Sequence, residues 1–417
     1  APFGFGPFLI VTDGTVWKAV GHRFSSFLGH RPGTTLHVLP SDPPPYASDA
    51  LVAKISSLVA STKAIPIAVG AGTINDIVKR AAFENGVRYA CVPTAPSVDG
   101  FTSSGAAITV SGFKTTLECP PPLCVIAEED ILVRAPRPMI ASGFGDIVAK
   151  LSGGADWIIA EAMGIEAIDQ VAWDLAQPAA VALFRRGREI REGEPESVGI
   201  LYKGLISTGL AMQRYKDSRP ASGAEHLLSH TWEMMRRGGE REEFSHGFKV
   251  AVGTLITSAL MRELFADSGS LRRLIEGRGF APRPDLLDYR LGLAELLPAD
   301  GQMKAQILNT IRSKTPSAGE IASRAERAAR IWPEMAGRVL RQIPAYPELK
   351  EALRAGGCPV EPAGVGLSRR ACVDGLRIAS LIRRRYTVLD LASELGALDA
   401  AADAVFSSSY FGEFAPA

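Results

Sequence analysis

Short apolar runs alternate with helical patterns over residues 1–135, and this alternation constrains the fold more than any other feature. Strands alternating with helices indicate a parallel sheet that is covered on both faces. Five segments have the length and composition of strands: residues 8–12, 35–39, 65–69, 89–92 and 123–126. Between them, residues 15–28, 47–61 and 73–85 predict helices, and a hairpin predicted over 106–110 and 113–117 interrupts the series.

From about residue 138 the strand patterns nearly vanish and long helical patterns follow one another. They cover residues 146–163, 167–186, 198–215, 224–237, 246–265 and 371–382, with charged, glycine-containing connections predicted at 188–196 and 236–243. We therefore predict an α/β N-terminal domain with a Rossmann-like parallel sheet, residues 1–138, followed by an all-α C-terminal domain, residues 139–417. Ligands of two-domain enzymes favour the cleft between the domains.

Composition excludes several classes of function. Hydrophobic residues make up 46% of the chain, charged residues 22%, and the net charge is +1, so nothing predicts binding to nucleic acid or to an anionic membrane. The five cysteines lack C-x-x-C spacing, which predicts neither disulfides nor a structural zinc site and suits the cytoplasm. The longest uncharged apolar runs are too short to span a bilayer, and the N-terminus does not have the pattern of a signal peptide. The chain begins at Ala1 without a methionine, which leaves open that residues precede it.

Three of the six histidines fall close together, at His226, His230 and His246. His226 and His230 are four residues apart and share one face of a helix, and a second helix beginning at His246 can bring a third imidazole to the same point. Imidazole is a common ligand of catalytic divalent metals. Taken alone, the cluster is either a metal site or three unrelated histidines, and both interpretations stay open here.

A glycine-rich turn at Gly70-Ala71-Gly72 follows a predicted strand and opens a predicted helix. Such a turn lets backbone N–H groups approach a phosphate, although tight turns also need glycine for geometry alone. Asn75 stands where the Rossmann fingerprint has its third glycine, and no Walker A lysine follows. Asp76 in the first helical turn would repel a pyrophosphate, so we expect it to meet hydrogen-bond donors such as a ribose hydroxyl, or to cap its own helix. The hydroxyl-rich loop 93–105 follows the next strand, at the edge where parallel sheets bind ligands.

Together these segments resemble the iron-containing alcohol dehydrogenase superfamily, and more narrowly its sn-glycerol-1-phosphate dehydrogenase branch. That branch shares its fold with glycerol dehydrogenase and dehydroquinate synthase. The resemblance covers nearly the whole chain and rests on motifs at residues 70–76, 93–101, 143–150 with 155–157, 218–234, 245–247 and 378–391.

The resemblance implies NAD or NADP as the cofactor. The residues that would hold it are Gly70, Gly72, Thr73, Ile74, Asn75 and Asp76 in the first loop, and Thr94, Ala95, Pro96, Ser97 and Ser103 in the second. Asp13 matches the position that meets the adenosine ribose, and a carboxylate there favours NAD over NADP.

The resemblance also places a divalent metal ion on Asp146, His226 and His246. The ion is expected to be zinc. Iron(II) and nickel(II) are alternatives, because these ligand types do not discriminate among the three ions. His230 and Asp99 match residues that contact the substrate. His230 is the candidate proton donor, and Asp99 is expected to orient substrate hydroxyls. Asp146 is also expected to contact the substrate. We expect Asp146 to begin its helix directly after Gly145.

The implied activity is metal-assisted hydride transfer between a ketone and a secondary alcohol. The best substrate pair is dihydroxyacetone phosphate and sn-glycerol 1-phosphate, and the enzyme is expected to be a homodimer or larger homo-oligomer. Candidate phosphate-binding cations are Lys114, Lys150, Arg214 and Arg219, each against the alternative of a surface ion pair. A related polyol or ketosugar dehydrogenase, a dehydroquinate-synthase-like cyclase or lyase that uses NAD transiently, and a non-catalytic nucleotide-binding protein are the alternatives.

Overall fold

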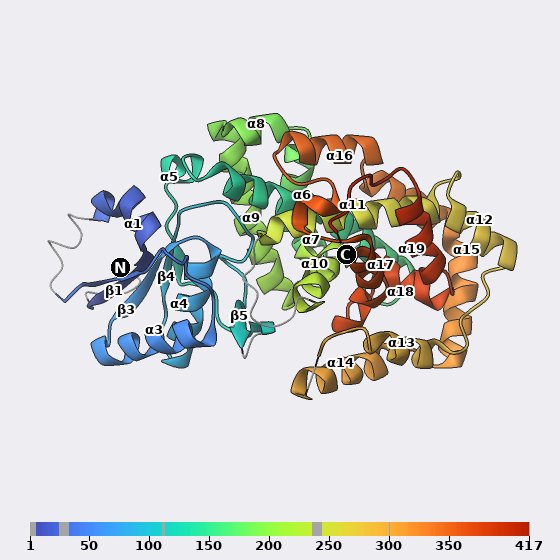
Figure 1. The fold of residues 1–417 in the computed structure, drawn as a ribbon, viewed down its shortest axis with the longest axis horizontal. Helices are drawn as coiled ribbons and strands as arrows, with labels where there is room; N and C mark the ends of the chain where they lie inside the picture. The colour runs from blue at the N-terminus through green and yellow to red at the C-terminus, as the bar shows by residue number, and fades with distance from the viewer. Residues whose placement is uncertain (1–5, 25–32, 111–112, 236–243, 300, 417) are drawn as a thin grey trace.

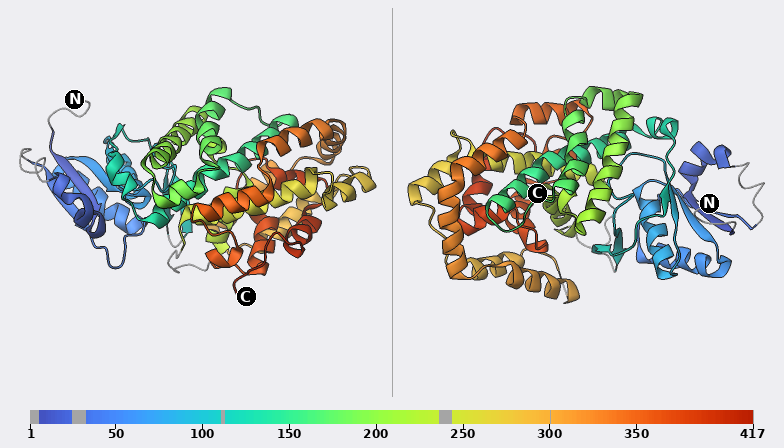
Figure 2. Two further views of the ribbon diagram at one scale, coloured as in Figure 1. Left: turned by 90° about the horizontal axis from the view of Figure 1, so that it is seen from above. Right: turned by 180° about the vertical axis from the view of Figure 1, so that it is seen from behind.

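The computed structural model describes residues 6–24, 33–110, 113–235, 244–299 and 301–416. The N-terminal sheet with its helices lies at one end of the molecule, and the helices of the later chain form the other end (Figures 1 and 2). The predicted order, a parallel sheet followed by a helical region, is confirmed.

The main sheet is parallel throughout and has the strand order β2-β1-β3-β4-β7. Its strands are β1 (Phe8–Asp13), β2 (Thr35–Leu39), β3 (Ile65–Gly70), β4 (Ala90–Pro93) and β7 (Cys124–Val125). The chain moves from β1 outward to β2 and then returns to the other side of β1 for β3, so the strand order reverses between β1 and β3. In parallel sheets, ligands bind beyond the carboxyl ends of the strands at such a switch point. Asp13 and Gly70 are the last residues of β1 and β3, which places both at that point.

Helices cover both faces of the sheet. The helices α3 (Asp49–Thr62) and α4 (Gly72–Glu84) share an apolar core with one face, whereas α1 (Gly14–Val20) and η1 (Gly21–Phe24) pack on the other. The predicted hairpin is present as antiparallel β5 (Ala106–Val110) and β6 (Phe113–Leu117), which form a separate two-stranded sheet.

The second region consists of helices around one large apolar core. Its elements are α5 (Glu129–Val133), α6 (Arg137–Ala162), α7 (Gln170–Leu183), α8 (Gly187–Glu192), α9 (Pro195–Tyr215), η2 (Arg219–Ala221), α10 (Ala224–Met235), α11 (His246–Phe265), α12 (Ser270–Arg278), α13 (Leu286–Ala294), α14 (Gly301–Lys314), α15 (Ala318–Gln342), α16 (Tyr346–Ala355), η3 (Pro362–Val365), α17 (Arg369–Ile378), η4 (Ala379–Ile382), α18 (Val388–Glu394) and α19 (Leu398–Ser407). Among the described residues, no helix is both long and apolar enough to cross a membrane.

Two predictions about helix boundaries are wrong. Asp146 does not begin a helix, because α6 begins at Arg137 with a proline in its first turn and runs through Asp146. The segment predicted as a connection at 188–196 instead contains α8 and the start of α9. The predicted connection at 236–243 lies outside the described residues. The division at residue 138 falls inside α6 and stays a prediction.

Candidate active site

Asp146 lies in the middle of α6, on a stretch where the helix touches other backbone segments very closely. A Cβ atom added to Gly143 would lie 1.8 Å from the carbonyl oxygen of Pro96, and one added to Gly145 would lie 2.5 Å from that of Gly247. These glycines therefore do not mark the start of a helix. They let α6 approach both the loop after β4 and the start of α11, which brings Asp146 to the place where the two regions meet.

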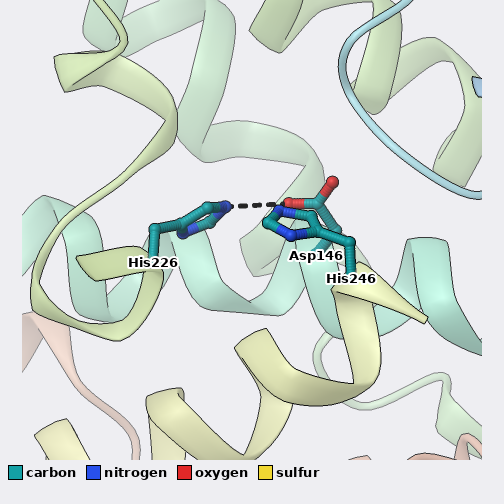
Figure 3. Close-up of side chains that lie close together, drawn as sticks. All are labelled: Asp146, His226 and His246. Atoms are coloured by element: carbon teal, nitrogen blue, oxygen red, sulfur yellow. Dashed lines mark ion pairs between the residues drawn. The ribbon is translucent and has the colours of Figure 1, made fainter. Parts of the chain in front are cut away.

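Three helices bring the predicted metal ligands together (Figure 3). Asp146 comes from α6, His226 from α10 and His246 from the first residue of α11, and one donor atom of each lies within 4.8 Å of the others. His226 Nε2 lies 3.3 Å from Asp146 Oδ1. Asp146 and His226 are buried, whereas His246 is partly exposed. Their roles as ligands stay a prediction.

Neighbouring carboxylates hold the first of these histidines in place. Glu225 Oε1 lies 2.9 Å from His226 Nδ1 and also accepts a 2.6 Å hydrogen bond from the backbone N–H of Gly223. Asp156 on α6 accepts from the N–H of Ala224, the first residue of α10, at 2.6 Å. Burial and Lys150 lower the pKa of His226, but its hydrogen bonds to Asp146 and Glu225 outweigh them, and the pKa is raised.

Lys150 lies one helical turn after Asp146 and joins the two carboxylates expected at the substrate. Its Nζ is 2.7 Å from Asp146 Oδ1 and 2.7 Å from Asp99 Oδ2, and its side chain is completely buried. The backbone N–H of Asp99 donates to Asp146 Oδ2 at 3.0 Å. Burial alone would lower the pKa of Lys150, but the two carboxylates outweigh it and raise that pKa. The structure thus assigns Lys150 to this buried charge network, and not to an unpaired site for phosphate.

His230 lies one turn along α10 from His226 and stacks on His246, with ring centroids 5.5 Å apart. Burial, together with His246 and Arg383, lowers the pKa of His230 to about 4, despite its hydrogen bond to Glu233. Its imidazole is therefore neutral at pH 7. Glu233 was not predicted from the sequence, and its carboxylate reaches both histidines.

The glycine turn leaves no room for a side chain at Gly70 or Gly72. A Cβ on Gly70 would lie 2.7 Å from Ile74, and one on Gly72 would lie 2.9 Å from Val98. No side chain caps the N-terminus of α4. Asn75 is 1% exposed, and its amide nitrogen is buried without a hydrogen-bond partner among the described residues. An unsatisfied buried donor at an uncapped helix N-terminus fits a polar ligand such as a dinucleotide.

The two acidic residues expected at the cofactor have partners within the protein. Asp76 Oδ2 accepts a 3.2 Å hydrogen bond from the backbone N–H of Ala107. Asp13 caps α1, because its Oδ1 accepts from the N–H groups of Thr15 and Val16 at 2.9 and 3.0 Å. Cofactor contacts from Asp13 and Asp76 stay predictions.

The loop after β4 is fixed by Lys79, which was also not predicted from the sequence. Its Nζ donates to the carbonyl oxygens of Gly100, Ser103 and Gly105 at 2.8, 3.1 and 2.9 Å, and the residue is 1% exposed. Three residues of this loop that were assigned to the cofactor, Ala95, Pro96 and Ser97, are buried against protein, whereas Thr94 and Ser103 are partly exposed. Contact between this loop and a cofactor stays a prediction.

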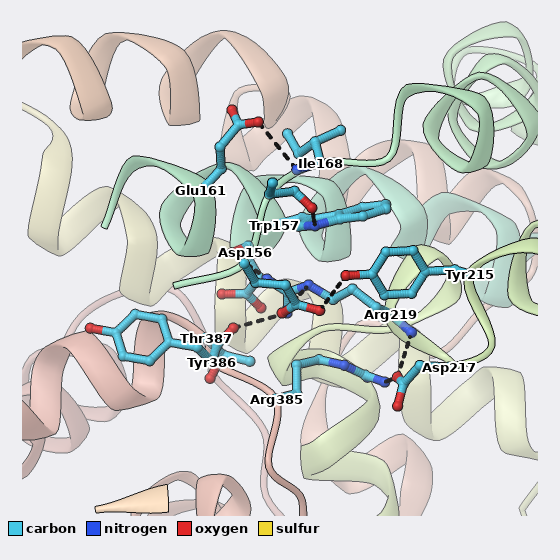
Figure 4. A network of polar contacts seen from close by, with 12 residues as sticks. Asp156, Trp157, Glu161, Ile168, Tyr215, Asp217, Arg219, Arg385, Tyr386 and Thr387 are labelled. Carbon is cyan, nitrogen blue, oxygen red and sulfur yellow. Dashed lines mark hydrogen bonds and ion pairs between the residues drawn. The ribbon is translucent and has the colours of Figure 1, made fainter. Parts of the chain in front are cut away.

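Arg219 and Arg214, two of the predicted phosphate-binding cations, are engaged elsewhere. Arg219 is 1% exposed and donates to the carbonyl oxygens of Tyr386 and Asp156, each at 2.9 Å (Figure 4). Arg214 pairs with Asp169 at 3.4 Å. The side chain of Lys114 lies outside the described residues.

The donor set fits a divalent metal ion. One carboxylate and two imidazoles are a common catalytic ligand set that leaves coordination positions for substrate. The carboxylate of Glu225 behind His226 is the usual support for a metal-binding imidazole, because it fixes the nitrogen that does not bind the metal.

Residues 3–136 match the family model described as iron-containing alcohol dehydrogenase. This part of the chain is similar to the iron-containing alcohol dehydrogenases. It is 42% identical over 190 residues to a glycerol-1-phosphate dehydrogenase [NAD(P)+] from Geobacillus thermodenitrificans, a match that covers 46% of this chain and 47% of the relative. A protein of the same name from Bacillus licheniformis is 34% identical over 265 residues, which cover 62% of this chain and 65% of the relative. The chain thus spans about half to two thirds of the length of these relatives, and the resemblance to the glycerol-1-phosphate dehydrogenase branch is confirmed over that span.

Solved structures of alcohol dehydrogenase relatives share the fold. A probable glycerol dehydrogenase from Sinorhizobium meliloti superimposes with a TM-score of 0.59 at 16% identity, and the match covers 96% of this chain and 92% of that protein's chain. Glycerol dehydrogenase from Schizosaccharomyces pombe gives a TM-score of 0.57 at 15% identity, and the match covers 99% of this chain and 88% of that protein's chain. The predicted fold is confirmed by these matches, which extend over both regions of the chain.

Proposed function

We propose that this chain is a metal-dependent, NAD(P)-linked oxidoreductase that interconverts dihydroxyacetone phosphate and sn-glycerol 1-phosphate. The convergence of Asp146, His226 and His246 from three helices carries the proposal. The ligand set faces the loop after β4, through the hydrogen bond between the Asp99 N–H and Asp146. The similarity to glycerol-1-phosphate dehydrogenases supports the choice of substrate.

Each polar side chain of the site has a defined part in this proposal. When bound, the metal ion supplies Lewis-acid polarisation of the substrate oxygen, and the nicotinamide exchanges a hydride with the substrate carbon. His230, neutral and partly exposed, gives or takes the proton of the substrate oxygen, directly or through water. Asp99, held by Lys150, accepts hydrogen bonds from substrate hydroxyls.

We propose Arg383 as the residue that binds the substrate phosphate. It directly follows η4, and η4 packs against α10, the helix that carries His226 and His230. Its charge is one cause of the lowered pKa of His230, which supports a position of Arg383 on the same side of the site as that ring. A guanidinium group is well suited to bind a dianionic phosphate through paired hydrogen bonds.

The remaining details rest on the resemblance. We infer a single divalent ion per chain, zinc in preference to iron(II) or nickel(II), with NAD or NADP as the redox partner. We further infer a homodimer or larger homo-oligomer that works in the cytoplasm.

An NADH-oxidation assay tests the proposal. We expect the purified chain to oxidise NADH or NADPH in the presence of dihydroxyacetone phosphate, and to do so far less with dihydroxyacetone or a panel of small ketoses. A chelator should abolish the reaction, and His226→Ala should lower both turnover and bound metal. Activity on another ketone alone would refute the substrate. Phosphate release from a sugar phosphate without net NADH change would instead identify a cyclase.

A further inference from the structure

Glu233 is a buried carboxylate that contacts two of the three clustered histidines. It lies three residues after His230 on α10, and its Oε2 is 3.3 Å from His230 Nδ1. Its Oε1 is 3.8 Å from His246 Nδ1, which is within ion-pair range but longer than a hydrogen bond. The side chain of Glu233 is only 7% exposed. One carboxylate thus lies between a proposed metal ligand and the proposed proton donor.

Lys249 fixes this carboxylate from the opposite side. Its Nζ lies 2.6 Å from Glu233 Oε1, and its side chain is 5% exposed. Lys249 lies one turn after His246 on α11, so the ion pair joins the second turn of α11 to the last turn of α10. Lys249 donates a hydrogen bond to Oε1 at this distance, which fixes the position of the carboxylate between the two histidines.

The arrangement parallels that around the other proposed histidine ligand. Glu225 Oε1 faces His226 Nδ1 at 2.9 Å, just as Glu233 Oε1 faces His246 Nδ1 at 3.8 Å. A carboxylate behind an imidazole places the ring proton on the nitrogen that faces it and leaves the other nitrogen to bind a metal or a substrate. Glu233 differs from Glu225 because its second oxygen also reaches His230.

We propose that Glu233 is a positioning residue that orients His246 towards the metal and His230 towards the substrate. Its carboxylate accepts a hydrogen bond from the Nδ1–H of His230 and attracts the Nδ1–H of His246 across 3.8 Å, so that the Nε2 atoms of both rings face the reacting groups. Metal binding and proton transfer are thereby coupled through one side chain. This inference rests on the proposed function for the role of His230, but its effect on His246 is tested without turnover.

The first test measures metal binding in the absence of cofactor and substrate. Zn²⁺ is titrated against a competing chelator into the full chain and into Glu233→Ala and Glu233→Gln. Loss of a carboxylate that supports a ligand weakens metal affinity by about 10–100-fold. We expect a loss of that size for Glu233→Ala and a smaller one for Glu233→Gln, because the amide oxygen can still accept one hydrogen bond.

Glu394→Gln is the matched control. The Glu394 side chain is 3% exposed and pairs with Arg324, so its substitution also removes a buried, paired carboxylate, but away from the histidines. We expect Glu394→Gln to lower the melting temperature and leave Zn²⁺ affinity unchanged. Equal Zn²⁺ affinity in wild type and Glu233→Ala would overturn the proposal. So would a second bound Zn²⁺ per chain that Glu233→Ala abolishes, since His230, Glu233 and His246 would then form a cation site of their own.

The second test reads the histidine tautomers directly. With only six histidines in the chain, ¹⁵N NMR of the imidazole rings can be assigned by single substitutions. In the Zn²⁺-loaded protein we expect His230 and His246 to carry their protons on Nδ1, and Glu233→Gln to change this pattern for His230. An unchanged pattern in Glu233→Gln and Glu233→Ala would refute the positioning role.

Kinetics then distinguishes this proposal from the proposed function. If the chain reduces dihydroxyacetone phosphate, Glu233→Gln at saturating Zn²⁺ should lower kcat at least tenfold with little change in KM. A fall in kcat/KM that comes from KM alone would contradict the proposal. If no ketone is reduced at all, the proposed function fails, while the Zn²⁺ affinity and the tautomer of His246 still decide whether Glu233 supports that ligand.

Discussion

Replacing Lys150 by methionine removes the only ammonium group that contacts Asp146 in the described part of the chain. Methionine keeps the length and the apolar contacts of the side chain but leaves Asp146 and Asp99 without their 2.7 Å partner. Removing one member of a buried ion pair costs about 3–5 kcal/mol, because the other charge stays buried. For a chain of 417 residues, an unfolding entropy of about 2.1 cal/mol/K per residue corresponds to roughly 0.9 kcal/mol/K. The metal-free Lys150→Met protein should therefore melt about 3–6 °C below the wild type.

A bound metal ion should reverse this loss. The ion lies against Asp146 and supplies the positive charge that Lys150 no longer provides, so saturating Zn²⁺ should raise the melting temperature more in Lys150→Met than in the wild type. Differential scanning calorimetry with chelator and with Zn²⁺ measures both shifts. The control is Lys314→Met, which breaks the buried pair between Lys314 and Asp390, 2.8 Å apart; the other hydrogen bonds of Lys314 go to the carbonyl oxygens of Ser380, Arg383 and Arg385 and not to Asp146. That variant should be destabilised equally with and without Zn²⁺. An equal loss in Lys150→Met under both conditions would show that Asp146 does not bind the ion.

Three further predictions concern pH, packing and substrate. Burial and the charge of Glu225 raise the pKa of Asp156 to about 7, so the stability it confers when protonated is lost as the pH rises through 7. Between pH 4 and 8, the free energy of unfolding of the wild type should fall by up to about 4 kcal/mol relative to that of Asp156→Asn, as measured by denaturant titration. If the unfolding free energies of the two proteins changed in parallel with pH, this prediction would be contradicted. Gly247→Ala would place a Cβ 1.8 Å from the carbonyl oxygen of Ser142, so it should lower the free energy of unfolding by about 1–3 kcal/mol and weaken Zn²⁺ binding. Gly292→Ala is the control: its added Cβ would meet nothing within 4 Å, so neither stability nor Zn²⁺ binding should fall. Arg383→Gln should raise KM for dihydroxyacetone phosphate about 10–100-fold and leave KM for dihydroxyacetone unchanged, and equal changes for both would exclude a role in phosphate binding.

The sequence predicted the elements whose signals are local. The hairpin β5–β6 and the helix α11 have the predicted bounds, because alternation in a strand and periodicity in a helix are set by neighbouring residues. The histidine cluster on α10 and α11 was also visible, since four-residue spacing on one helix face is a property of the sequence alone. The residue set around the metal came from the resemblance and not from spacing.

The features that the sequence did not predict depend on tertiary contacts. Gly143 and Gly145 looked like the turn before a helix, although both lie inside α6, where close approach to Pro96 and Gly247 excludes a side chain. Glycine lowers helix propensity, and here packing outweighs it. Lys79 was not singled out from the sequence, yet three carbonyl oxygens of a distant loop surround its Nζ. No local pattern reveals such a partner.

The charges around the histidines bear on the kind of ion that this centre can bind. The carboxylates in the network are those of Asp99, Asp146, Glu225 and Glu233, and the ammonium groups are those of Lys150 and Lys249. With neutral imidazoles, and leaving aside the Arg383 guanidinium group proposed to lie near His230, these six described side chains carry a formal charge of −2, which favours a cation. Lys150→Met makes this charge −3 and Glu233→Gln makes it −1, so the two variants should shift metal affinity in opposite directions. A Zn²⁺ titration at low salt should give the tightest binding in Lys150→Met, then wild type, then Glu233→Gln, because these buried charges are poorly screened. Weaker binding in Lys150→Met than in wild type would show that Lys150 organises Asp146 for the ion more than its charge opposes binding.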